Sequence, residues 1–86
     1  MYIILTYDVS SRRDSKVMKA CRRYLTHSQK SVFEGVLSDA DLSHLKKELT
    51  KLIDIKEDSI HIYEFQTMKY STKEEIGVTI GDDNIL

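Results

Sequence analysis

Asp8 is the residue whose type and place in this chain most suggest chemistry. It comes near the end of residues 2–9, Tyr-Ile-Ile-Leu-Thr-Tyr-Asp-Val, whose β-branched and aromatic side chains favour a largely buried strand. A carboxylate at the end of such a strand can stay ionised in water while its backbone is held rigidly, which suits metal binding. An Asp in this place also commonly hydrogen-bonds the turn that follows. Position alone therefore leaves a metal-binding role and a turn role open.

A row of cations lies in the segment after this run. Ser11 can cap a helix of residues 12–25, and Asp14 falls in its first turn, where a negative charge suits the helix dipole. The apolar stripe of this helix comprises Val17, Ala20, Cys21 and Tyr24. A separate narrow arc holds Arg12, Lys16, Lys19 and Arg23. Because a solubilising face usually mixes signs, this row predicts either a solvated face or a surface for nucleic-acid phosphates.

The composition limits the class of protein. A domain of 86 residues buries only somewhat more than about 60% of the surface that its unfolded chain exposes, so a partner subunit would help. The single cysteine, Cys21, excludes an intramolecular disulfide and is expected to be a buried, inert thiol. No apolar run approaches the roughly 18 residues of a membrane span. We therefore expect a cytoplasmic protein without membrane contact.

The formal net charge of -1 conceals a difference between the two parts of the chain. Residues 1–51 hold ten Lys and Arg against six Asp and Glu, whereas residues 52–86 hold three against eight. A polyanion would meet the first part, although ordinary solvated faces explain the same difference.

The middle of the chain predicts a strand followed by a helix. Residues 30–37 indicate a second strand, in which Gly35 points to a bulge or to a close approach by another backbone. Ser38 and Asp41 resemble a capping box ahead of a helix of residues 39–53. The apolar face of this helix consists of Leu42, Leu45, Leu49, Leu52 and Ile53.

The order of elements predicts an α+β two-layer sandwich of ferredoxin-like type, with two helices on one face of a mainly antiparallel sheet. Residues 59–65 alternate strictly, with apolar or aromatic side chains on both sides, so a second subunit is expected to cover one face. Residues 76–80 indicate a strand too short to be stable alone. One strand stays undetermined. Either residues 27–38 form one long strand bent at Gly35, or the segment after Phe65 completes the sheet.

Two motifs are similar to those of a known family. The first is residues 7–9, Tyr-Asp-Val, followed by Arg12 and Arg13, and the second is residues 29–35, Gln-Lys-Ser-Val-Phe-Glu-Gly. With the strand that begins near residue 58, they make the chain resemble the small CRISPR-associated endonucleases of the second Cas protein family. These proteins act with a larger integrase subunit in spacer acquisition.

The resemblance implies a ferredoxin-like domain over residues 1–86, with a core in residues 1–66 and a dimer-completing segment in residues 67–86. It also implies a symmetric homodimer whose sheets face each other, with the C-terminal strand joining the partner's sheet. Asp8 would approach its symmetry mate, and the pair would hold one Mg²⁺ or Mn²⁺, where a water could attack a phosphodiester. Tyr7 and Phe33 match family positions associated with catalytic activity.

The resemblance further implies a CRISPR integrase subunit as a partner, together with DNA, RNA or both. Together with the basic row, it assigns nucleic-acid binding to Arg12, Arg13, Lys16, Lys19, Arg23 and Ser31. Two functions stay open, a metal-dependent endonuclease and a non-catalytic DNA-binding dimer that bridges integrase subunits. A ferredoxin-like RNA-binding module or a toxin-type ribonuclease is the alternative outside the family. His27 stands where several relatives have an arginine, which removes a permanent cation from that place.

Overall fold

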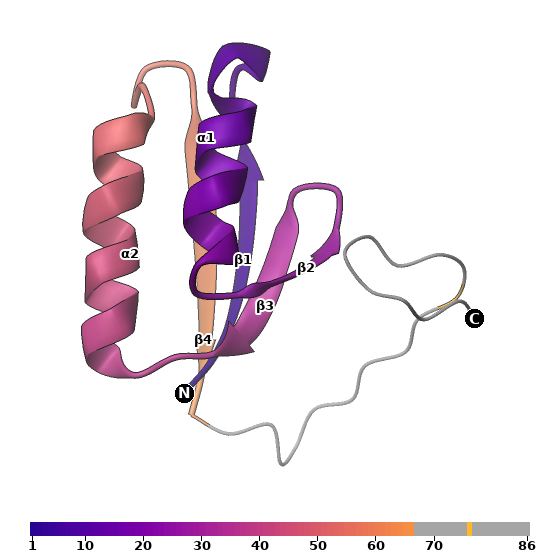
Figure 1. Ribbon diagram of the computed structural model, residues 1–86, viewed down its shortest axis with the longest axis vertical. Coiled ribbons are helices and arrows are strands. Elements are labelled where there is room, and N and C mark those ends of the chain that lie inside the picture. The colour runs from indigo at the N-terminus through magenta and orange to yellow at the C-terminus, as the bar shows by residue number, and fades with distance from the viewer. Residues whose placement is uncertain (67–75, 77–86) are drawn as a thin grey trace.

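The computed structural model of the chain describes residues 1–66 and residue 76. Its elements are β1 (Tyr2–Asp8), α1 (Ser11–Arg22), β2 (Thr26–Gln29), β3 (Val32–Val36), α2 (Asp39–Leu52) and β4 (Ser59–Phe65). The strands form one antiparallel sheet in the order β2-β3-β1-β4, and the two helices lie side by side over one face of it (Figure 1). This confirms the predicted α+β two-layer sandwich. In the described residues, no helix is long and apolar enough to cross a membrane.

The core lies between the helices and the sheet face that they cover. Along β1, Ile3, Leu5 and Tyr7 are buried, while the residues between them are only half-buried, as expected for a strand whose side chains alternate between two faces. The helices contribute the predicted stripes. Val17, Ala20 and Cys21 of α1 and Leu42, Leu45 and Leu49 of α2 are buried, whereas the other predicted members, Tyr24, Leu52 and Ile53, are partly buried against the core.

Both helices begin at serine caps. Ser38 caps α2 as predicted, because its hydroxyl accepts from the Asp41 N–H at 3.1 Å. Ser10 caps α1, so the prediction of Ser11 as the cap is wrong by one residue. This helix also ends at Arg22 instead of continuing to Leu25, because its last turn tightens: the Arg23 and Tyr24 N–H groups donate to carbonyls three residues back, those of Ala20 at 3.3 Å and Cys21 at 3.0 Å.

The segment between the helices is a hairpin, which the sequence did not reveal. The predicted strand of residues 30–37 is wrong at its start, and so is the alternative of one long strand over residues 27–38. Gln29 pairs with Val32 across a two-residue turn, and the register shifts between His27 and Gln29. His27 and Ser28 are consecutive buried residues, so β2 shows no period of two by which a strand is recognised.

Gly35 confirms the expected close approach and is not at the bulge. A Cβ at this position would lie 3.3 Å from Leu25 Cδ2 and 3.8 Å from Leu25 Cα. A side chain here would therefore crowd Leu25, which lies in the loop between α1 and β2. The strand of residues 59–65 is found as predicted. The predicted strand of residues 76–80 and the segment of residues 67–86 lie outside the described residues, apart from the exposed Ile76.

Candidate active site at the end of strand β1

Asp8 is an exposed residue at the C-terminal end of β1, which is one of the two central strands of the sheet. Its side chain belongs to the sheet face that the helices leave uncovered, because side chains alternate and Tyr7 points to the core. In the neighbouring strand β4, Ser59 is its register partner. The backbone of Asp8 is thus held by the sheet while its carboxylate meets solvent.

The uncovered sheet face, here called the open face, carries apolar side chains that one chain does not bury. The register places on it Tyr2, Ile4, Val36, Tyr63 and Phe65. Val36 is 74% exposed, Tyr63 51% and Phe65 37%. The Tyr2 hydroxyl donates to a Glu34 carboxylate oxygen at 2.7 Å across the same face. An apolar surface of this kind marks an interaction site. Asp8 lies on the same face, beyond Thr6 and His61, at the C-terminal end of β1.

Tyr7 and Phe33, predicted to be catalytic by resemblance, lie on the other side of the sheet. Both are buried, and their rings stack with centroids 6.2 Å apart. Burial and the neighbouring Asp14 carboxylate raise the pKa of Tyr7 to about 12, although its hydroxyl has no hydrogen-bond partner among the described residues. Within one chain these rings support β1 from beneath and do not reach the face that carries Asp8.

His27 extends this aromatic stack under the β2–β3 turn. Its ring lies 4.4 Å from the Phe33 ring centroid with an interplanar angle of 12°, and its Nε2 contacts the Lys30 carbonyl oxygen. Its Nδ1 is buried without a hydrogen-bond partner in the part of the chain that the structure describes. The imidazole therefore fixes the turn from the core side and does not present a charge to the open face.

Asp58 fixes the loop that follows Asp8, and sequence reasoning did not identify this role. One oxygen, Oδ1, accepts from the Ser10 N–H at 2.9 Å, while Oδ2 accepts from the Asp54 N–H at 2.9 Å and from Arg13 Nε at 2.5 Å. The Arg13 guanidinium holds the pKa of Asp58 far below its usual range. The only sequence signal is a single Asp just ahead of a strand, which many turns share.

The structure divides the predicted cations into paired and unpaired groups. Arg13 is committed to Asp58 and, at 2.8 Å, to Glu57. Arg12 lies 3.4 Å from Glu57, and Arg23 pairs with Glu48 of α2. The exposed pairs of Arg12 and Arg23 contribute little stability, but they reduce the positive charge that is available to a ligand.

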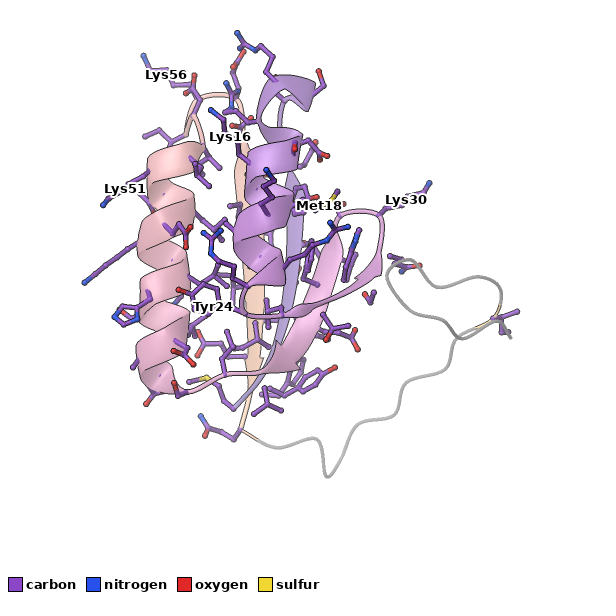
Figure 2. The ribbon with its side chains drawn as sticks, viewed as in Figure 1. Lys16, Met18, Tyr24, Lys30, Lys51 and Lys56 are labelled. Carbon is purple, nitrogen blue, oxygen red and sulfur yellow. The ribbon has the colours of Figure 1, made fainter. Side chains whose placement is uncertain are left out.

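Lys16 and Lys19 lie on the exposed side of α1, and no ion pair joins either of them to another described residue. Figure 2 shows Lys16 projecting from the helix on the side away from the sheet. Ser31 is half-buried in the hairpin turn, where its carbonyl accepts from the Tyr7 N–H at 3.1 Å.

A family model described as "CRISPR associated protein Cas2" matches residues 1–73 of the chain. The chain belongs to the Cas2 family. It is 42% identical to a protein of Thermotoga maritima named "CRISPR-associated endoribonuclease Cas2", over 100% of this chain and 99% of that protein. A Dictyoglomus turgidum protein of the same name is 41% identical over 91% of this chain and 90% of its own length.

Solved Cas2 structures share the fold. One, titled "Crystal structure of cas2", has a TM-score of 0.85 at 35% identity and covers 100% of this chain and 97% of its own. Streptococcus pyogenes Cas2 has a TM-score of 0.75 at 32% identity, over 87% of this chain and 99% of its own. These matches confirm the family that the two sequence motifs indicated.

The residues of a single Cas2 chain do not form a complete metal site. Among the described residues, no group of three or more His, Cys, Asp or Glu side chains could hold a metal ion. Asp8 offers one carboxylate per chain, whereas Mg²⁺ in proteins is held by one or two carboxylates and keeps several waters. Two copies of Asp8 would meet that requirement, so the residues fit Mg²⁺ only across an interface between chains.

Proposed function

We propose that this chain is an endonuclease that hydrolyses phosphodiester bonds of RNA or DNA at two Asp8 carboxylates, one from each subunit of a homodimer, with Mg²⁺ or Mn²⁺ as cofactor. The observation that carries the proposal is the exposed Asp8 at the end of a central strand, on the same face as the exposed apolar side chains. The endoribonuclease names of the relatives support a nuclease and favour RNA as a substrate.

The dimer follows from the open face. Two sheets packed face to face would bury Val36, Tyr63 and Phe65, which are exposed when the chain is alone. A two-fold axis brings identical residues together, so a pair of Asp8 side chains arises without any further acidic residue. The dimer-completing segment of residues 67–86 belongs to this proposal.

The chain's own residues would prepare the site for the metal and the substrate. Hydrogen bonds within the sheet fix Asp8, and Asp58 fixes the loop after it through the Ser10 N–H. The stacked rings of Tyr7 and Phe33 keep β1 in place from the core side. Two neighbouring carboxylates repel each other, which favours a cation between them. Mg²⁺, when bound, would stabilise the charge that develops on the phosphoryl group.

Asp8→Asn tests the catalytic proposal. We expect cleavage of single-stranded RNA or DNA by the purified protein to fall by about 100-fold or more, because a neutral amide cannot replace the carboxylate pair. Cleavage is measured with Mg²⁺ and with EDTA. The exposed Asp39 of α2 provides a matched control, and Asp39→Asn should cleave like the unchanged protein. Equal cleavage by Asp8→Asn would contradict the proposal.

A scaffold that bridges integrase subunits on DNA is the second candidate function. Lys16 and Lys19 favour it, because they lie on α1, away from the open face, without a described acidic partner. Sequence-independent phosphate contacts by such lysines would position duplex DNA. If the scaffold alone accounts for function, Asp8→Asn supports spacer integration with the integrase as well as the unchanged protein does.

A further inference from the structure

His61 of β4 lies on the open face, diagonally across from Asp8 of β1. The residues before and after His61 in the sequence are half-buried against the core, so the alternation of the strand turns His61 to the opposite side. The register pairs Asp8 with Ser59 and Thr6 with His61. His61 is therefore one step along β4 from the residue that lies directly opposite Asp8, and both side chains are on the same face.

This spacing allows the two side chains to bind one ion. Diagonal neighbours in an antiparallel pair of strands lie about 7–8 Å apart, which is within reach of aromatic and long side chains. The bonds from a metal ion to a carboxylate oxygen and to an imidazole nitrogen are each about 2 Å long. An ion between Asp8 and His61 can thus bind both of them while the register of the sheet stays as it is.

The imidazole of His61 is available to a ligand. His61 is exposed, and no hydrogen bond, ion pair or ring contact joins it to another residue in the part of the chain that the structure describes. The other two histidines are placed differently. His27 is buried and contacts the Lys30 carbonyl oxygen, and His44 is exposed on α2. Of the three, His61 alone shares a face with Asp8.

We infer that His61 is a metal ligand of the Asp8 site and makes this site bind divalent transition metals such as Zn²⁺ in preference to Mg²⁺. The inference rests on the proposed function and adds a nitrogen ligand to its oxygen ligands. Imidazole suits Zn²⁺ and neighbouring transition metals, whereas Mg²⁺ is held by carboxylates and water. A two-fold axis would supply two carboxylates and two imidazoles, which are ligand types that Zn²⁺ accepts.

Binding of Zn²⁺ and of Mg²⁺ to the whole chain, without nucleic acid, tests the inference. Zn²⁺ is titrated against a competing indicator dye, and Mg²⁺ is titrated by calorimetry. We expect the unchanged protein to bind Zn²⁺ at least about tenfold more tightly than Mg²⁺. His61→Gln should weaken Zn²⁺ binding by about tenfold or more, since loss of even an outer-shell partner of a metal ligand costs about 10- to 100-fold.

Mg²⁺ and His44 provide the controls. His61→Gln should leave Mg²⁺ affinity within about twofold of its original value, because Mg²⁺ is held by the carboxylates. Unchanged Mg²⁺ binding would also show that the paired Asp8 site still forms in this variant. His44→Gln removes an exposed imidazole from α2 and should change neither affinity.

Two results would overturn the inference. One is Zn²⁺ binding by His61→Gln as tight as that by His44→Gln, and the other is an unchanged protein that binds Zn²⁺ no more tightly than Mg²⁺. Asp8→Asn distinguishes these failures from a failure of the proposed function. Cleavage in Mg²⁺ that survives Asp8→Asn would contradict the proposed function, whereas the Zn²⁺ affinities of His61→Gln and His44→Gln would still decide the role of His61.

Discussion

The two faces of the sheet contrast sharply, although the same strands build both. On the face covered by the helices, Ile3, Leu5 and Phe33 are completely buried. On the open face, Tyr63 and Val36 remain more than half exposed. The strands alternate between a side that completes the fold of one chain and a side that remains uncovered in it. Burial of the first side accounts for folding, while the second side is available for association and for placing Asp8.

This contrast separates support from chemistry. The residues most deeply packed near the site, Tyr7 and Phe33, are on the covered face, and Asp8 is on the open face beside them. Substitutions on the covered face should therefore act through stability, and those on the open face through assembly and activity. Three perturbations test that division, given in order of decreasing effect on the free energy of unfolding.

Phe33→Ala should have the largest effect on folding. It removes a fully buried ring that stacks on both Tyr7 and His27, and should lower the free energy of unfolding by about 3–5 kcal/mol. Tyr63→Ala removes an aromatic ring from the open face and should cost less than about 1 kcal/mol in the monomer. Urea unfolding at low protein concentration measures both. Equal losses would contradict the division between the faces.

Alkaline pH should weaken the covered face by a smaller amount. Burial raises the pKa of the Cys21 thiol from 9.0 to about 12, so the unfolded chain releases this proton first. This contribution to stability is complete below pH 9.0 and is lost as the pH rises toward the folded pKa. The free energy of unfolding should fall by up to about 1.4 kcal/mol per pH unit for this group.

The matched variant for this prediction is Cys21→Ala, which keeps a small apolar side chain in the core. Urea unfolding between pH 9 and pH 11 should show a shallower decline for Cys21→Ala than for the unchanged protein. The buried Tyr7 titrates in the same direction, with a pKa raised from 10.0 to about 12, so some decline remains in the variant. Identical slopes for the two proteins would show that the Cys21 thiol does not remain protonated in the core.

Val36→Glu should have the smallest effect on the fold. Val36 is 74% exposed in one chain, so the free energy of unfolding of the monomer should change by less than about 0.5 kcal/mol. The dimer should dissociate, because a two-fold axis would bury two added carboxylates without partners. Sedimentation velocity measures the dimer, and Ser43→Glu on the exposed side of α2 controls for added charge. A dimer unaffected by Val36→Glu would place its interface elsewhere.

The sequence predicted the regular elements well where their periods were clear. The strand of residues 59–65 alternates strictly, and α2 carries leucines at helical spacing after a serine cap, so both were found close to their observed bounds. The hairpin was missed because β2 is short, polar and interrupted by a shift in register. The Ser10 cap was placed one residue too late, since adjacent serines offer the same hydroxyl to the first turn.

The candidate site could be predicted only in part, because some of its contacts join residues that are far apart in the sequence. Asp8 follows from local sequence, because a carboxylate that ends an apolar strand is visible without the fold. The pairing of Arg13 with Asp58 cannot be seen in the sequence. The two residues are 45 positions apart, and they meet only when the start of α1 lies beside the start of β4. That pairing distinguishes a structural arginine from the neighbouring cations, which the charge pattern alone treats alike.

The sequence by itself determined the α+β order of elements, the covered stripes of both helices and the resemblance to the Cas2 family, because these depend on residue type and spacing along the chain. Only the tertiary structure decided which side of each strand stays uncovered and which cations are already paired. These features depend on contacts between residues distant in sequence, and such contacts exist only after the sheet has chosen its register and the helices their face.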